Sequence, residues 1–419
     1  MIQAGKLETR KGEALAEARA CTDRVFQSVP ESAWYERPVP TRHRLLFYLG
    51  HVEAFDRNLI GQTGLMLPSF HQEFNRLFAF GIDPQADHVP SDNPSDWPSL
   101  GEVRQYVSRS RKALDEVSNE IPSLLLSVVI EHRLMHAETF TCLLHNLNEP
   151  LSLGAGNLPS ATVSSQAPLP IMIEIPAGMA TLGQSRRPSG SEDGLGSDGF
   201  GWDNECDEHS VSVPSFAIGK YKVTNAQYLT FVEAGAGPPH FWRRRDNRWF
   251  WRTLLGEIPL PLDWPVFVTY QEAEAYAHWA GKSLPTEAQF HRAAYATSMG
   301  EERRYPWGDA PPEAQRGNFN FQRWDPIPVT ADPLGESAFG VAQLVGNGWE
   351  WTATVFCPFP GFQPFAFYPG YSAPFFDGDH HVLKGGSSHT AARLLRRSFR
   401  NWFRPDYPYV YAGFRCVDN

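Results

Sequence analysis

Three histidines in the first third of the chain have the residue type and spacing to bind a metal ion. His132 and His136 lie four residues apart in the apolar run IEHRLMHAETFTCLL (130–144). On a helix this spacing directs both imidazoles to one face, about one turn apart, so both can reach one ion. His51, in a second helical pattern (45–60), is the candidate third ligand. Three neutral imidazoles suit Zn, Fe, Ni or Cu and leave coordination positions open for chemistry.

Each of these histidines could instead be an ordinary core or surface residue. A single HxxxH pair matches many sequences that bind no metal. The third histidine, on a separate helical pattern, favours the metal site over this alternative.

The histidines need a helical scaffold that brings two distant segments together. Residues 1–150 contain four main helical patterns, and two of them carry the histidines. The other two cover 7–29 and the amphipathic segment 99–121, and a shorter pattern covers 69–80. Such helices, joined by short connections, favour an antiparallel bundle, in which metal sites form from side chains on facing helices.

After residue 150 the composition and the hydrophobic pattern of the chain change. Residues 151–170 are rich in Ser, Ala, Gly and Pro and predict a linker. In 171–419, apolar and polar residues alternate as in strands in IMIEIPAGMATLG and HSVSVPSFAIGKYKVT, which flank a flexible or ligand-facing loop (185–208). Helices are expected at 224–235 and 269–281, each with a threonine N-cap. The short pieces punctuated by Gly, Pro and Trp that follow predict sparse regular secondary structure.

Composition excludes several classes of protein. The 419 residues allow two or three domains, and 42% hydrophobic with 20% charged residues is typical of a globular protein. A net charge of −10 disfavours nucleic acid as a partner. We find no apolar run long enough to span a membrane and no signal peptide, so a cytoplasmic location is expected. Five widely spaced cysteines without a CxxC pair predict reduced thiols.

A series of motifs in the second part resembles the formylglycine-generating-enzyme fold, which is of the C-type-lectin kind. The motifs are KVTNAQYLTFVEA, FVTYQEAEAYAHWAGKSLPTEAQFHRAA, RYPWGD, VGNGWEWTAT, VLKGGSS and YAGFRCV. Preceded by a DinB-like four-helix bundle with three histidines, this domain resembles the mononuclear non-heme iron synthases of ergothioneine biosynthesis. The resemblance implies an α+β protein with a bundle over 1–150 and a formylglycine-generating-enzyme-like domain over 171–419.

The resemblance also implies an activity. Such enzymes use iron(II) and O2 to join sulfur to carbon 2 of the hercynine imidazole and yield a sulfoxide, and the related selenoneine synthases take a selenosugar. Formylglycine generation itself is not expected, because it needs a cysteine pair and no cysteine lies between Gly385 and Arg415. The segment RRSFRNWFRPDYPYVYAGFR resembles the region that lines the substrate pocket, which places Asn401 and Trp402 beside the substrates. Either residue could instead only support the loop and the core.

Two departures from the family pattern concern the chalcogen donor. Many ergothioneine synthases have glutamine before the last histidine, where this chain has Met135. Members that use γ-glutamylcysteine carry aspartate after the RNW triplet, where this chain has Phe403. Neither side chain can bind an ammonium or a carboxylate by charge. The departures favour a donor with less charge than γ-glutamylcysteine, such as cysteine held elsewhere or a sugar stacked on aromatic rings. Of these a selenosugar is our first choice, although both residues could simply pack.

The remaining candidates follow from the chemistry that the resemblance implies. A proton donor is needed near the oxygen atoms that derive from O2, and the loop FYPGYSAPFF offers Tyr371, our first choice, and Tyr368. The trimethylammonium of hercynine favours aromatic faces such as Trp402. Arg400 and Arg404 are candidates for a substrate carboxylate, or for ion pairs within the protein.

Two other classes of function stay open. DinB-like bundles also occur as thiol-dependent transferases with a three-histidine zinc or nickel site, for which O2 would be irrelevant. Alternatively, a metal-free bundle would make the protein a scaffold that binds carbohydrate or peptide.

Overall fold

The computed structural model describes residues 2–61, 65, 67, 70–79, 90–151, 166–186 and 199–418, with side chains from residue 12 onwards. The described residues form two compact units, one ending at residue 151 and one beginning at 166. Most of the expected linker, 152–165, lies outside the described residues, as do 187–198 of the expected loop. The domain boundaries at 150 and 170 therefore stay predictions.

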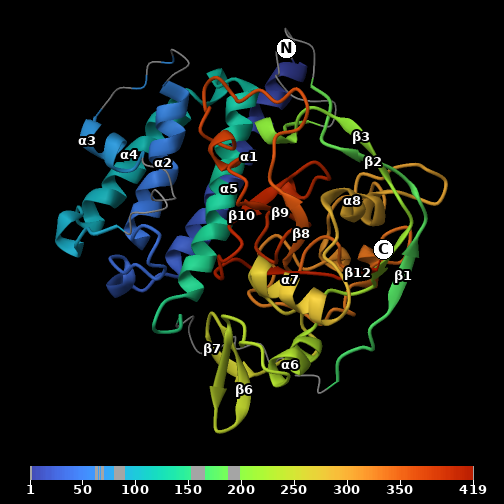
Figure 1. Cartoon of the computed structure of the whole chain (residues 1–419). Coiled ribbons are helices and arrows are strands. Elements are labelled where there is room, and N and C mark those ends of the chain that lie inside the picture. Colours follow the sequence, from blue (N-terminus) through green and yellow to red (C-terminus); the bar gives the residue numbers. More distant parts are fainter. Residues whose placement is uncertain are drawn as a thin grey trace. The chain divides into compact units, whose positions relative to one another are not determined.

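The N-terminal unit is a bundle of helices, as expected (Figure 1). Its members are α1 (Ile2–Gln27), α2 (Leu45–Gly61), α3 (Gln72–Leu77), α4 (Leu100–Glu116) and α5 (Ser123–His145). α5 packs against α1 and α2, and α2 also packs against α4. The short pattern 69–80 forms only the six residues of α3 as helix, and its two end residues lie outside the described part.

The two histidine-bearing helices carry mostly apolar residues and are buried on nearly every side, because they form the centre of the bundle. On α2, Phe47 and Val52 have no exposed surface, and on α5 the same holds for Val128 and Phe140. The more amphipathic α4 covers them, and its first turn is closed by a capping box between Ser99 and Glu102. No described helix is both long enough and apolar enough to cross a bilayer.

In its described residues, the C-terminal unit combines three α-helices with short strands. The helices are α6 (Asn225–Glu233), α7 (Tyr270–Trp279) and α8 (Glu287–Tyr295). The strands are β1 (Met172–Ile175), β2 (Gly178–Leu182), β3 (His209–Val213), β4 (Phe216–Gly219), β5 (Trp242–Arg245), β6 (Arg248–Thr253), β7 (Gly256–Pro259), β8 (Trp349–Val355), β9 (His381–Lys384), β10 (Asn401–Phe403), β11 (Ala412–Gly413) and β12 (Val417–Asp418). The expected strands and both expected helices are present, with Thr224 and Thr269 as N-caps.

Four small sheets organise this unit. Their strand orders are β1-β4-β12, β10-β9-β8-β11, β2-β3 and β5-β6-β7. Every pairing is antiparallel except that of β11 with β8. α8 packs on β2, β3, β8 and β9, and its Phe290 and Ala293 enter the core with Ile175 and Ile218. The centre of the unit is thus a helix that joins two sheets (Figure 1).

Beside this core lies a buried ion triad. Both oxygens of Glu350, on β8, are used: one lies 2.5 Å from Lys222 Nζ and the other 2.8 Å from Arg415 Nε. All three side chains have no exposed surface. Burial lowers the pKa of Lys222 to about 8, although the carboxylate of Glu350 opposes this shift. The triad joins Lys222, three positions before α6, to the strand β8 and to Arg415 near the end of the described residues.

Candidate metal centre and aromatic site

The three histidines come together inside the N-terminal bundle. α2 carries His51, α5 carries His132 and His136, and each side chain is buried. The Nε2 atoms of His132 and His136 are 3.1 Å apart, and one ring nitrogen from each of the three residues lies within 4.8 Å of the others. Two nitrogens bound at right angles to one ion, each about 2.1 Å from it, would be about 3 Å apart. The spacing therefore fits imidazoles that share an ion.

The tautomer of His51 is set by the chain just after α3. Its Nδ1 lies 2.6 Å from the carbonyl oxygen of Phe78, and since a carbonyl only accepts, Nδ1 carries the proton and donates it. Nε2 then keeps its lone pair, and this buried atom has no hydrogen-bond partner in the described part of the chain. Metal-bound histidines commonly donate their other N–H in this way. His51 is thus held in the form that a metal requires.

Gly50 allows Phe78 to come this close to α2. A Cβ added at Gly50 would lie 2.6 Å from ring carbons of Phe78, a distance that real Cβ atoms do not tolerate. A larger side chain would therefore push the ring away from the helix, and the Phe78 carbonyl with it. The glycine before His51 has a packing role that its position in the sequence does not reveal.

Aromatic rings and burial keep the histidines neutral. Phe55 stacks on His132 with ring centroids 3.5 Å apart, and Phe47 stacks on His51 at 4.9 Å. Burial lowers the pKa of His51 to about 4 and the pKa values of His132 and His136 well below the usual range. Neutral imidazole is the ligating form, and the buried Nε2 of His51, which has no hydrogen-bond partner among the described residues, is free to bind an ion. The residues present thus fit a bound transition metal.

The metal-free protein is expected to lose stability as the pH falls from about 6.5 towards 4. A histidine whose pKa is depressed in the folded state takes up a proton more readily in the unfolded state. The free energy of unfolding is therefore highest at pH values above the unfolded-state pKa, and it decreases as the pH drops from there towards the folded-state pKa. The shift of His51 alone corresponds to about 3 kcal/mol. Urea unfolding at several pH values measures this slope.

A triple variant, His51→Gln, His132→Gln and His136→Gln, serves as the comparison for this pH dependence, because every other histidine remains. Its slope between pH 4 and 6.5 should be smaller by up to three protons, or about 4 kcal/mol per pH unit. An unchanged slope would show that these three histidines are not buried neutral in the folded chain.

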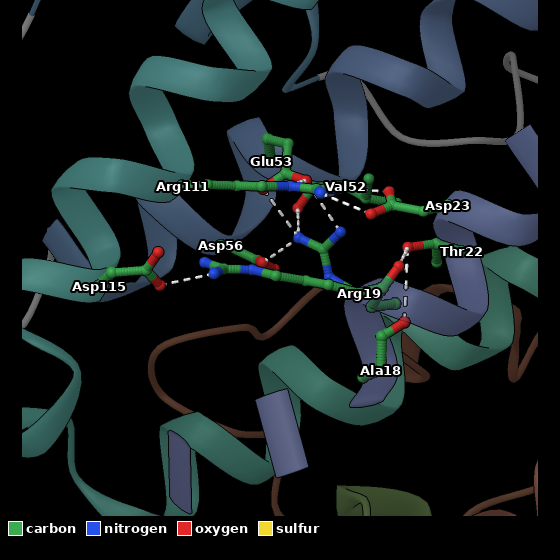
Figure 2. Close-up of polar contacts among 10 residues, drawn as sticks. Ala18, Arg19, Thr22, Asp23, Val52, Glu53, Asp56, Arg111 and Asp115 are labelled. Atoms are coloured by element: carbon green, nitrogen blue, oxygen red, sulfur yellow. Dashed lines mark hydrogen bonds and ion pairs between the residues drawn. The ribbon is translucent and has the colours of Figure 1, made fainter. Parts of the chain in front are cut away.

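A charge cluster includes residues of both helices that carry the histidines, α2 and α5. Figure 2 shows its acidic residues and Arg111. Arg133, the residue after His132, donates to both oxygens of Glu53 at 2.9 Å and also to Asp56. Arg111, on α4, donates to Glu53 at 2.7 Å and bidentately to Asp23, on α1, at 2.7 Å. Sequence reasoning missed this cluster, although charged residues within the apolar helix patterns were a visible signal.

The tyrosine chosen from the sequence lies in an aromatic cluster of the C-terminal unit. The ring of Tyr371 stacks on Trp202 with centroids 3.9 Å apart and meets Trp402 edge-on at 5.5 Å. Trp402 in turn stacks on Phe356 at 4.3 Å. Tyr368 lies 5.7 Å from Tyr371 and is less buried. The structure thus brings Tyr371, Tyr368 and Trp402 together.

The other candidates of the C-terminal unit differ in how far they are engaged. Asn401 accepts from the backbone N–H of Trp402 through Oδ1 at 2.9 Å, and Phe403 stacks on Tyr407 at 5.1 Å. The guanidinium of Arg400 is buried, 3.1 Å from Glu287 and 4.0 Å from the ring centre of Phe359.

Two further candidates complete the set. Arg404 is 46% exposed and lies 3.9 Å from Asp379 in an ion pair. Met135 is half-buried on α5, one residue before His136.

Sequence reasoning missed two residues that hold Tyr371. Trp202 and Asp203 lie within the loop 185–208 that we expected to be flexible or ligand-facing, yet both are buried. Asp203 accepts from the hydroxyl of Ser372 at 2.6 Å, and Ser372 directly follows Tyr371. Burial raises the pKa of Asp203, and the Ser372 hydrogen bond opposes this shift. The WDNE run at the end of the loop was the only signal.

Comparisons with known proteins agree with this architecture. Residues 14–143 match the DinB superfamily, and residues 159–419 match the sulfatase-modifying factor enzyme 1-like domain. Hercynine oxygenase of Mycolicibacterium thermoresistibile is 36% identical over 85% of this chain and 81% of its own length. Hercynine oxygenase of Mycolicibacterium smegmatis is 37% identical over 85% of each. Ergothioneine biosynthesis protein 1 of Schizosaccharomyces pombe is 31% identical over 93% of this chain and 53% of its own length.

A DinB bundle with three buried histidines, followed by a sulfatase-modifying-factor-type domain, defines the class of the protein. The chain belongs to the ergothioneine synthase-like family. This confirms the α+β fold and the family that the motifs indicated.

Proposed function

We propose that the protein is an O2-dependent, mononuclear non-heme iron(II) enzyme that forms a carbon–chalcogen bond at carbon 2 of the hercynine imidazole. The observation that carries this proposal is the set of converging, neutral, buried histidines in a chain similar over most of its length to hercynine oxygenases. Hercynine, a selenosugar or a thiol, and O2 would be the substrates. We expect the enzyme to act in the cytoplasm.

His51, His132 and His136 would hold the iron. Bound iron(II) would supply O2 activation and favour a deprotonated chalcogen donor. O2 accepts four electrons: two are released as the C–H and Se–H bonds are replaced by C–Se, and two as selenium is oxidised. One oxygen atom ends in the selenoxide and the other in water. A thiol donor gives the same balance with sulfur.

Three candidates of the C-terminal unit that are exposed or half-buried, Asn401, Trp402 and Arg404, would bind hercynine. Trp402, beside Tyr371 and Phe356, provides an aromatic face for the trimethylammonium group. Arg404 suits the carboxylate better than Arg400, because the guanidinium of Arg400 already contacts Glu287. Asn401 would orient the imidazole through its amide nitrogen.

Tyr371 is the proposed proton donor, and Tyr368 is the alternative. Stacking on Trp202 and the Ser372–Asp203 hydrogen bond beside it restrain Tyr371, and a restrained hydroxyl loses little freedom when it acts as an acid. Phenylalanine replacements separate the two residues. Replacing the tyrosine that donates the proton should lower kcat by about 100-fold or more and leave hercynine binding nearly unchanged.

A selenosugar is the favoured donor, and cysteine or γ-glutamylcysteine is the alternative. Met135 and Phe403 offer no charge to a peptide donor, whereas Phe403, stacked on Tyr407, forms an aromatic surface suited to a sugar. Phe403→Asp introduces the carboxylate of γ-glutamylcysteine-using relatives. If the donor choice depends on this position, the variant should shift activity towards that peptide.

Anaerobic reconstitution with iron(II), followed by O2 and hercynine, tests the function. Selenoglucose, cysteine and γ-glutamylcysteine are supplied in parallel, and mass spectrometry identifies the adduct. An adduct with one donor identifies the synthase and its donor. If an iron-loaded protein forms no adduct and consumes no O2 with any donor, the oxidative function is wrong, and a metal-dependent thiol transferase takes its place.

A further inference from the structure

The charge cluster joins the two helices that carry the candidate metal ligands. Glu53 and Asp56 lie one turn apart on α2, and Arg133, on α5, binds both of them. None of the three side chains has any exposed surface. Arg111, which reaches Glu53 from α4, and Asp23, on α1, extend the cluster to the other helices (Figure 2).

We propose that Arg133, held by Glu53 and Asp56, is a positioning residue for the three-histidine centre: it sets the register of α5 against α2 so that His132 and His136 meet His51. The inference rests on the metal site in the proposed function and is independent of the donor and of the reaction with O2.

A contribution to folding stability does not by itself explain why these three charged side chains are buried. Desolvating three ionised groups is costly, and well-packed apolar residues at such positions are often at least as stabilising. The cluster is also imperfectly satisfied, since Arg133 Nε and Asp56 Oδ1 are buried without a hydrogen-bond partner among the described residues. Buried polar groups are best attested as devices that select one register of packed helices.

The geometry of the contacts constrains both sliding and rotation. A guanidinium bound to both oxygens of Glu53 has a fixed direction, and its third contact, to Asp56 one turn further along α2, fixes the axial position. A slip of one residue moves a helix by about 1.5 Å and turns it by about 100°.

The ligand geometry tolerates no such slip. Metal–nitrogen bonds of about 2.1 Å cannot follow a displacement of that size. Because Arg133 directly follows His132 on a continuous helix, its position is passed on to both histidines of α5.

The test replaces the three charges together, by Glu53→Leu, Asp56→Leu and Arg133→Met. Arg111 keeps both oxygens of Asp23 and is therefore not left without an anion. Cobalt(II) is the probe, because its visible absorption reports the ligand geometry, and its affinity is measured by titration of the metal-free full chain. Thermal unfolding without metal measures stability separately.

The expected result is cobalt binding weaker by about 10- to 100-fold with an altered visible spectrum, while the metal-free protein unfolds at or above the wild-type temperature. Arg133→Lys should fall between the triple variant and the wild type, since an ammonium cannot bind Glu53 bidentately and also reach Asp56. The matched control is Lys222→Met with Glu350→Leu and Arg415→Met, which removes the equally buried ion triad of the C-terminal unit and should leave the cobalt affinity and spectrum unchanged.

Wild-type affinity and spectrum in the folded triple variant would overturn the inference. If the triple variant does not fold, Arg133→Lys decides, and an unchanged spectrum there overturns it as well. Failure of the wild type to bind cobalt would instead refute the metal site itself. Normal cobalt binding without a hercynine adduct would refute only the proposed reaction.

Discussion

Replacement of His136 by alanine is expected to abolish stoichiometric metal binding and to lower activity to below about 1% of the wild-type rate. Loss of an outer-shell partner alone typically costs 10- to 100-fold in metal affinity, and His136 is one of only three ligands in the site. The three histidines are buried, and their group contains no further His, Cys, Asp or Glu among the described residues that could take the place of His136. Metal content after reconstitution, measured by elemental analysis, and turnover with hercynine check this prediction.

His145→Gln is the control for this loss. His145 is a buried histidine on the same helix, but it lies outside the three-histidine group. It should retain one equivalent of metal per chain. Full metal occupancy in His136→Ala would mean that the metal is bound elsewhere.

Replacement of Glu350 by leucine is expected to destabilise the C-terminal unit by about 3–5 kcal/mol. The change leaves the cations of Lys222 and Arg415 buried without their anion, and breaking one side of a buried ion group is far more costly than replacing the whole group. For a unit of this size the loss lowers the melting temperature by about 10 °C. Tryptophan fluorescence follows this unit, because 11 of the 13 tryptophans lie after residue 170.

An exposed ion pair in the same unit provides the comparison. Lys282 lies 2.7 Å from Asp418, whose side chain is 59% exposed. Asp418→Asn should change the stability by less than about 1 kcal/mol, because solvent screens the pair. If Glu350→Leu were no more harmful than this control, the triad would not be held together by charge.

The sequence alone was sufficient for the features that depend on local spacing. His132 and His136 share a helix face because four residues make about one turn, whatever the rest of the chain does. The caps at Ser99, Thr224 and Thr269 are local for the same reason. The ordered motifs of the second half indicated the family, and the comparisons confirmed it.

The contacts made between distant segments depend on how the chain folds. His51 is restrained by a carbonyl 27 residues away, Arg133 finds its acidic partners 77 and 80 residues away, and Asp203 meets Ser372 across 169 residues. No periodicity encodes such pairs, because they result from the packing of whole helices and loops. The sequence by itself therefore determined which residues could do the chemistry, and only the tertiary structure decided their tautomers, partners and supports.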